Sequence, residues 1–162
     1  MTRPGPVEVI VTGGQTGVDR AAMDFAIEVG IPLCGWIPQG RLDEHGVIPA
    51  RYPGLVESDD ADPGVRTRLN VRDSDGTLII ARGQLAGGTR LTAEEAARLN
   101  RPLIALDPDA RDVLESGQVL RAWLIAMGVR RLNVAGPRAS EDAGIYGMAL
   151  AALRAAFAEP GA

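Results

Sequence analysis

Short apolar runs alternate with amphipathic segments along this chain, and this alternation constrains the fold more than any other feature. Apolar runs typical of strands buried on both faces occur over Val7–Val11, Ile31–Trp36, Thr77–Ala81, Pro102–Leu106 and Leu132–Ala135. Helical spacing predicts helices over Val18–Val29, Pro63–Arg72, Ala93–Asn100, Val113–Gly128 and Asp142–Ala158. Strands joined by helices pair in parallel, so the sequence predicts a three-layer α/β sandwich of Rossmann type with about five or more strands.

Length and charge narrow the classes of function. The 162 residues suit one domain over residues 1–162. A formal net charge of −4 argues against nucleic-acid binding, which needs a basic surface. All 17 basic residues are arginine, which excludes a Schiff-base lysine and the lysine of an ATPase phosphate loop. Arginine must therefore make any cationic contact to a phosphate group.

The sequence carries no pattern for a membrane or for secretion. No stretch approaches the roughly 20 apolar residues of a membrane span. Residues 1–6 lack the apolar core of a signal peptide, so we interpret them as a short leader and expect a cytoplasmic protein. Cys34 is the only cysteine and His45 the only histidine, which excludes an internal disulfide and a thiolate-rich zinc site. We expect no metal held directly by protein ligands.

A glycine-rich turn follows the first predicted strand, where a helix is about to begin. Its candidate phosphate-binding residues are Gly13, Gly14, Gln15, Thr16, Gly17 and, one turn into the helix, Arg20. The turn matches neither GxGxxG nor GxxxxGK[ST], so the dinucleotide and ATPase signatures are absent. Bare backbone amides at a helix N-terminus still bind anions. The alternative is a tight turn in which Asp19 only supports the helix N-terminus electrostatically.

Two further turns have a similar composition. Gly87, Gly88 and Thr89 precede a predicted helix with Thr92 as its N-cap and Glu95 as the capping-box partner, so we expect a phosphate cradle there. Gly136, Arg138 and Ser140 follow the last strand, with Arg138 as a candidate anion clamp and Ser140 as a candidate N-cap. Because ligands in such folds sit beyond the carboxyl ends of the strands, all three turns belong to one predicted site.

The turn Asp73-Ser74-Asp75-Gly76 precedes a predicted strand and so lies at the opposite edge if that strand is parallel. Turn chemistry explains these residues, although paired carboxylates also suit a metal or acid–base chemistry. Residues 37–62 form a long irregular stretch, and a stretch of that length in a compact domain is usually functional or a lid.

Several segments together resemble the family called "putative molybdenum carrier", relatives of the SLOG superfamily by circular permutation. The resemblance rests on Thr12–Ala22, Gly35–Arg41, Ile48–Pro53, Arg66–Thr67, Asn70–Thr77, Gly87–Thr89, Gly136–Arg138 and Gly144–Tyr146. It implies a Rossmann-like fold, a homo-oligomer (dimer or tetramer), and a pocket for molybdenum cofactor (molybdopterin with its terminal phosphate) or a nucleotide. It also makes the following residues candidates for the pocket or a subunit interface: Trp36, Arg41, Arg51, Asn70, Asp73, Ser74 and Asp75.

LOG enzymes of this superfamily carry PGGxGTxxE, whose glutamate helps to cleave an N-glycosidic bond. Aligning Gly88 and Thr89 with that pattern puts Thr92 at the glutamate position, so the resemblance favours a binding protein over an enzyme. The alternatives are a LOG-type nucleoside 5′-monophosphate phosphoribohydrolase and a nucleotide-sensing module. The enzyme would need a carboxylate from elsewhere, and the candidates are Asp73, Asp75, Glu44 and Glu57.

Overall fold

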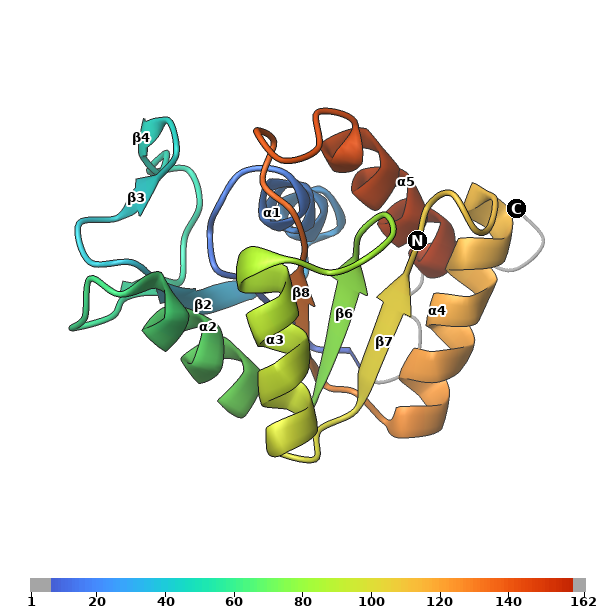
Figure 1. The fold of residues 1–162 in the computed structure, drawn as a ribbon. Coiled ribbons are helices and arrows are strands. Elements are labelled where there is room, and N and C mark those ends of the chain that lie inside the picture. The colour runs from blue at the N-terminus through green and yellow to red at the C-terminus, as the bar shows by residue number, and fades with distance from the viewer. Residues whose placement is uncertain (1–6, 159–162) are drawn as a thin grey trace.

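The computed structural model describes residues 7–158 and contains a six-stranded parallel sheet between two layers of helices (Figure 1). The sheet strands are β1 (Val9–Val11), β2 (Leu33–Ile37), β5 (Leu55–Glu57), β6 (Gly76–Ile80), β7 (Leu103–Leu106) and β8 (Arg131–Ala135). Every pairing within this sheet is parallel. The predicted α/β sandwich of Rossmann type is confirmed. The leader predicted at residues 1–6 lies outside the described residues.

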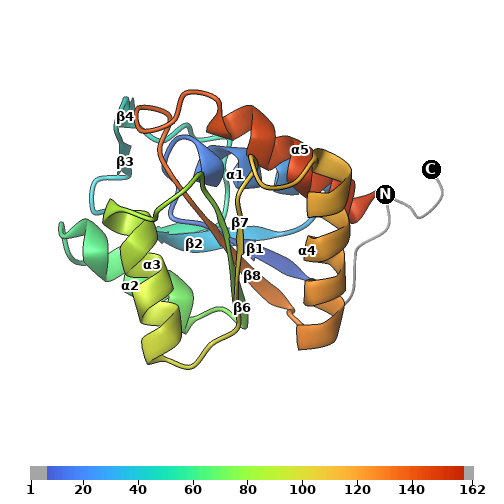
Figure 2. The same ribbon diagram turned by 45° about the vertical axis from the view of Figure 1, so that its right-hand side comes forward.

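Five helices cover the two faces of the sheet: α1 (Val18–Val29), α2 (Pro63–Arg72), α3 (Gly87–Arg98), α4 (Val113–Met127) and α5 (Ile145–Phe157). Helices α1, α4 and α5 lie on one face, and α2 and α3 pack together on the other (Figure 2). Right-handed crossovers produce this division, because connections that run in opposite directions along the sheet place their helices on opposite faces. Phe25 of α1 meets Phe157 of α5 edge to face, with 4.9 Å between ring centroids.

The strand order is β5-β2-β1-β8-β6-β7, so the last strand of the chain lies in the middle of the sheet. Asn133 of β8 pairs in register with Val11 of β1 on one side and with Thr77 of β6 on the other. The loops that follow β1, β8 and β6 therefore emerge next to one another at the carboxyl edge. The connections after β1 and β6 run in opposite directions along the sheet, and ligands in open α/β sheets bind where the connections diverge in this way.

The stretch over residues 37–62 is more regular than the sequence predicted. It contains β5, which extends the sheet beside β2, and a hairpin of β3 (Leu42–Asp43) and β4 (Gly46–Val47). These strands of two or three residues are too short to show an alternating pattern. The hairpin stands above the carboxyl edge, near the start of α1 (Figure 1).

Two predicted helix starts were wrong. Helix α3 begins at Gly87 rather than Ala93, and Thr92 lies inside it, where its hydroxyl donates to the carbonyl of Gly88 at 2.8 Å. The two glycines suggested a loop, yet they form the first helical turn. Helix α5 begins after Gly144, so Ser140 is not its N-cap. No helix within residues 7–158 has the length and apolarity to cross a membrane.

Candidate functional site

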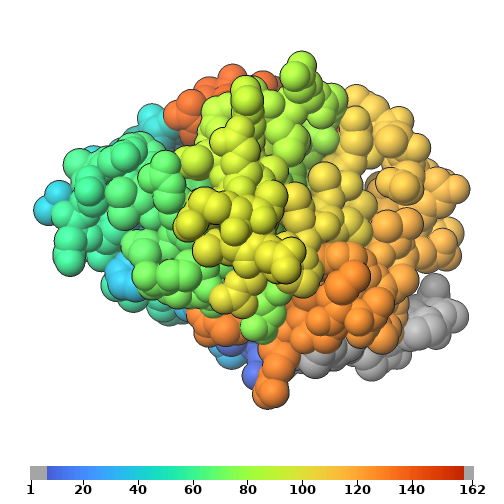
Figure 3. All heavy atoms as spheres, turned by 60° about the horizontal axis from the view of Figure 1, so that its bottom comes forward, coloured from blue at the N-terminus to red at the C-terminus, as the bar shows by residue number. Residues whose placement is uncertain are grey.

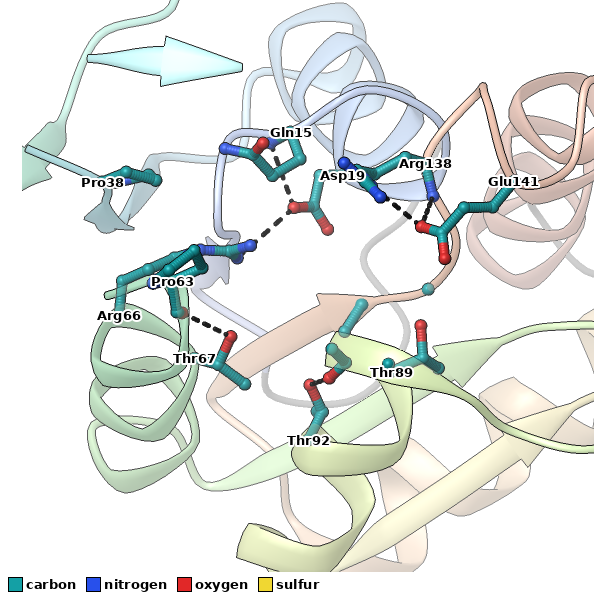
Figure 4. Close-up of a pocket in the computed structure, with 14 residues that line it drawn as sticks. Gln15, Asp19, Pro38, Pro63, Arg66, Thr67, Thr89, Thr92, Arg138 and Glu141 are labelled. Atoms are coloured by element: carbon teal, nitrogen blue, oxygen red, sulfur yellow. Dashed lines mark hydrogen bonds and ion pairs between the residues drawn. The ribbon is translucent and has the colours of Figure 1, made fainter. Parts of the chain in front are cut away.

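A cavity of about 310 Å³ opens at the carboxyl edge, between the loops after β1 and β8 and the helices α2 and α3 (Figure 4). Seven of the predicted site residues line it: Gln15, Gly87, Gly88, Thr89, Thr92, Gly136 and Arg138. The cavity also has lining residues that the sequence did not single out as ligand-binding: Asp19, Pro38, Pro63, Arg66, Thr67, Ala135 and Glu141. Segments from all parts of the chain thus converge on one site.

One wall is built by a buried ion pair between α1 and α2. Asp19 is 5% exposed, and its Oδ2 accepts a hydrogen bond from the Gln15 amide at 3.1 Å and lies 4.0 Å from Nη1 of Arg66. A Cβ on Gly13 would collide with the Arg66 guanidinium, so this glycine leaves the space that the arginine fills. Sequence analysis gave Asp19 only a supporting role for the helix. The structure places its carboxylate in the cavity wall.

Burial shifts the protonation of both partners. It raises the pKa of Asp19 to about 6, outweighing the opposing attraction of Arg66. It lowers the pKa of Arg66, while the Asp19 carboxylate acts in the other direction. Nε of Arg66 is buried and has no hydrogen-bond partner among residues 7–158. The second oxygen of Asp19 likewise accepts no hydrogen bond from the described residues. This wall therefore offers the free Asp19 oxygen to a ligand, with the Arg66 side chain, 16% exposed, beside it.

The opposite wall is the N-terminus of α3. Its N-cap is Ala86, which has no side chain able to cap the helix. The amides of Gly87, Gly88 and Thr89 donate no hydrogen bond within the described part of the chain. A Cβ on Gly88 would meet no atom within 4 Å, so the space in front of this turn is open. Free amides at the positive end of a helix dipole attract an anion.

The loop after β8 completes the cavity. Gly136 is required here because a Cβ would collide with the carbonyl of Ile80. Arg138 lies across the cavity from Thr89, and its Nε donates to Oε1 of Glu141 at 3.0 Å (Figure 4). The Glu141 carboxylate also reaches the α3 terminus, with Oε2 4.0 Å from the position of a Cβ on Gly87. An acidic side chain therefore lies beside the amides that would hold an anionic ligand.

Thr16 and Ser140 have a different role in this structure. Both hydroxyls hydrogen-bond the carboxylate of Glu44 at the tip of the β3–β4 hairpin, and the Ser140 amide donates to it at 3.2 Å. These bonds, Ser140 first and Thr16 second, lower the pKa of Glu44 to about 2. The amide of Ala139 donates to Thr16 at 3.0 Å. This network ties the hairpin to the loops after β1 and β8.

The remaining members of the first glycine turn lie outside the cavity lining. Arg20 pairs with Asp43 at 2.7 Å and stacks on the Tyr52 ring. Gly14 packs beside Ile37 and Ile48, and Gly17 lies against the backbone of residues 137–139. These contacts are all within the protein.

Four of the candidates for a pocket or an interface lie together around β2 and the end of α2, and three of these, Trp36, Asn70 and Asp73, line one small pocket there. Asn70 lines a small recess beside the main cavity and holds both backbone groups of Trp36. The Trp36 indole donates to Asp73, and Ser74 donates to the carbonyl of Asn70. Asp75 accepts from the amides of Arg130 and Arg131 at the start of β8, away from the carboxyl edge.

The two loop arginines make internal contacts. Arg41 donates to three carbonyls within residues 48–52, and Arg51 stacks on Tyr52. Glu57, a carboxylate considered for catalysis, accepts from the Gly40 amide at 2.6 Å. Thus none of Glu44, Glu57, Asp73 and Asp75 lines the main cavity, whereas Asp19 does.

Within residues 7–158, no group of three or more His, Cys, Asp or Glu side chains is arranged to hold a metal ion. The single histidine, His45, has an exposed side chain on the hairpin. Cys34 is half-buried, and its sulfur lies 3.4 Å from Nη2 of Arg131. The cavity chemistry is therefore that of arginine, carboxylate, hydroxyl and backbone amide.

Comparisons with known proteins agree with the predicted resemblance. Residues 10–157 match the model of the circularly permutated YpsA SLOG family. A crystal structure described as "putative molybdenum carrier protein", from Syntrophus aciditrophicus SB, is 42% identical in sequence, with a TM-score of 0.92. The match covers 95% of this chain and 97% of that chain. No curated protein matches. The chain belongs to the circularly permutated YpsA SLOG family.

Proposed function

We propose that this protein binds a phosphorylated small molecule in the main cavity, specifically molybdenum cofactor, and that it stores or carries it. One observation carries the proposal: the uncapped N-terminus of α3 faces Arg138 across the cavity (Figure 4). A phosphate between them would accept bonds from Gly87, Gly88 and Thr89 while pairing with the guanidinium. Charge-assisted bonds of this kind are the strong ones.

The other wall suits the pterin end of molybdopterin. The pterin has a 2-amino-4-oxo edge, which donates N–H bonds and accepts one through its carbonyl. Asp19 offers an oxygen without a partner among residues 7–158, and the partly exposed Arg66 side chain lines the same wall. A hydrogen bond from the pterin to this carboxylate would favour the ligand by about 1.5–3 kcal/mol. The metal would arrive on the dithiolene sulfurs of the cofactor, so it needs no protein ligand.

The relationship to a protein described as a "putative molybdenum carrier protein" supports the same assignment. Sequence identity of 42% over nearly the whole chain makes a shared ligand class a reasonable inference. We also infer a cytoplasmic homo-oligomer that does not bind nucleic acid, in keeping with the net charge of −4. The mass of the native assembly tests the oligomer directly.

The test is to measure ligand retention and affinity. Native mass spectrometry of freshly expressed protein is expected to show a bound pterin phosphate, and titration with molybdenum cofactor is expected to show micromolar or tighter binding. Arg138→Ala should weaken binding about 10- to 100-fold, the effect of losing one charged hydrogen-bond partner. Arg90→Ala is the matched control, because Arg90 is exposed on α3 and pairs with Glu94. No binding at micromolar concentrations would contradict the proposal.

A second candidate is hydrolysis of a nucleoside 5′-monophosphate. It is favoured by Asp19, a cavity carboxylate whose pKa of about 6 suits proton transfer near neutral pH. Release of the base from AMP, abolished in Asp19→Asn, would support this activity. Intact AMP after prolonged incubation with the wild-type protein would argue against it. The nucleotide-sensing module remains a third prediction.

A further inference from the structure

A second cavity, of about 470 Å³, adjoins the main one at the carboxyl end of β6. Thr89 and Glu141 line both cavities, so the two spaces share a wall. Neighbouring residues in the chain line different cavities. Ala86 and Pro137 line the second cavity, whereas Gly87 and Gly136 line the first. The two cavities thus lie end to end, with the N-terminus of α3 at their junction.

The shared wall includes one half-exposed side chain, that of Glu141. Glu141 is 42% exposed, and Arg138 is its cationic partner. If Glu141 swings into solvent, the α3 amides and Arg138 remain at the junction, and the space between the cavities opens. An anionic group bridging the two cavities would take the place of this carboxylate beside Gly87. The junction is therefore suited to a negatively charged linker.

The second cavity has a mixed lining, as the first does. Its apolar residues are Ala81, Leu85, Ala86 and Pro137, and its polar ones are Arg82, Gln84, Thr89, Glu141 and Asp142. Its cation, Arg82, is already paired, since Nε donates to Asp142 at 2.9 Å and Nη1 contacts Asp109. A guanidinium neutralised by two carboxylates has little attraction for another phosphate. The flat face of the Arg82 guanidinium and the apolar residues beside it suit an uncharged ring or sugar.

We propose that the ligand has two halves joined by a pyrophosphate. One half fills the main cavity, the pyrophosphate lies at the α3 terminus between Arg138 and the free amides, and a nucleoside-sized group occupies the second cavity. This inference rests on the proposed function and adds the second half of the ligand. The main cavity of about 310 Å³ is near the lower end of the range for ligand sites, about 300–1,000 Å³, and so has room for one half only.

The experiment compares two fluorescent probes on the full chain. The first is the oxidised pterin monophosphate released from molybdenum cofactor, and the second is the same pterin joined through a pyrophosphate to guanosine. The second probe is expected to bind at least about tenfold more tightly, because only it fills both cavities. Gln84→Trp, at an exposed position that lines the second cavity and lies outside α3 and its N-cap, should abolish that difference without weakening the first probe.

Ala110→Trp is the matched control, because Ala110 is exposed and lines neither cavity. It should leave both affinities unchanged. Equal affinities for the two probes in the wild type, or an equal loss of both in Gln84→Trp, would overturn the two-part ligand and leave the proposed function standing. Failure of both probes to bind would overturn the proposed function as well.

Discussion

Asp19 and Arg66 form a buried pair across the α1–α2 side of the cavity, with Oδ2 and Nη1 4.0 Å apart. The separation is long for a salt bridge, and burial raises the pKa of Asp19 to about 6 despite the arginine. An ion pair optimised for stability would keep the carboxylate ionised. This pair instead leaves one Asp19 oxygen in the cavity wall without a partner among residues 7–158, an arrangement typical of a binding site.

Replacing Asp19 with asparagine should change how stability depends on pH. The native pKa of about 6 exceeds the ordinary value of 3.8, so the folded protein binds this proton more tightly than the unfolded chain. The resulting stabilisation is complete below pH 3.8 and is lost as pH rises through 6. A shift of about two units corresponds to about 3 kcal/mol. Urea denaturation at pH 4 to 8 should show the free energy of unfolding of the wild type falling relative to Asp19→Asn by roughly that amount. Asp59→Asn, an exposed site outside the cavity, should show no such divergence.

Replacing Arg66 with methionine should destabilise the fold at neutral pH. The substitution removes the cation that opposes burial of Asp19, so the pKa of Asp19 should rise above 6. Breaking one side of a buried pair costs about 3–5 kcal/mol. Carboxyl carbon NMR would follow the titration, and thermal denaturation would follow stability. The double variant Arg66→Met with Asp19→Asn should recover part of the loss, and an unchanged Asp19 titration in the single variant would refute the assignment.

Replacing Glu141 with glutamine should strengthen the binding of an anionic ligand. The carboxylate of Glu141 occupies Arg138 and lies beside the α3 amides, so it competes with a phosphate for both. Removing one like charge at this partly exposed site should increase affinity about tenfold at low salt, and less at high salt. Calorimetric titration with the pterin monophosphate at two ionic strengths would measure both effects. Glu115→Gln, on α4 outside the cavity, should leave affinity unchanged.

Replacing Glu44 with glutamine should loosen the β3–β4 hairpin. Glu44 joins the hairpin to Thr16 and Ser140, and these bonds lower its pKa to about 2. The ionised Glu44 carboxylate therefore stabilises the attachment of the hairpin above the ordinary pKa of 4.5. This stabilisation is lost as pH falls toward 2. Limited trypsinolysis after Arg41 should be faster in the variant at neutral pH. Exchange of the hairpin amide hydrogens at about pH 2 should be nearly as fast in the wild type as in the variant, because Glu44 is then largely protonated. Glu94→Gln should behave as the wild type in both measurements.

Much of the fold could be predicted because its signals are local. The start of α2 follows from Asp62 as N-cap and Pro63 as the first helical residue, and Gly30 and Gly128 end α1 and α4 with positive φ. The start of α3 could not be predicted in this way. Two glycines disfavour a helix by propensity, but the packing of α3 against α2 and the sheet outweighs that preference. The strand β5 was missed because three residues carry too little pattern.

The sequence by itself determined the parallel α/β architecture and the positions of the glycine-rich turns at the ends of β1, β6 and β8. Both follow from the alternation of apolar strands with helices, because parallel strands bring their carboxyl ends to one edge. Only the tertiary structure decided that β8 lies between β1 and β6, that Arg66 fills the space left by Gly13, and that Glu141 lies beside Gly87. These contacts join segments far apart in the chain, and local periodicity contains no information about strand order. The physical cause is packing: each buried group takes its partner from whichever element the sheet order brings next to it.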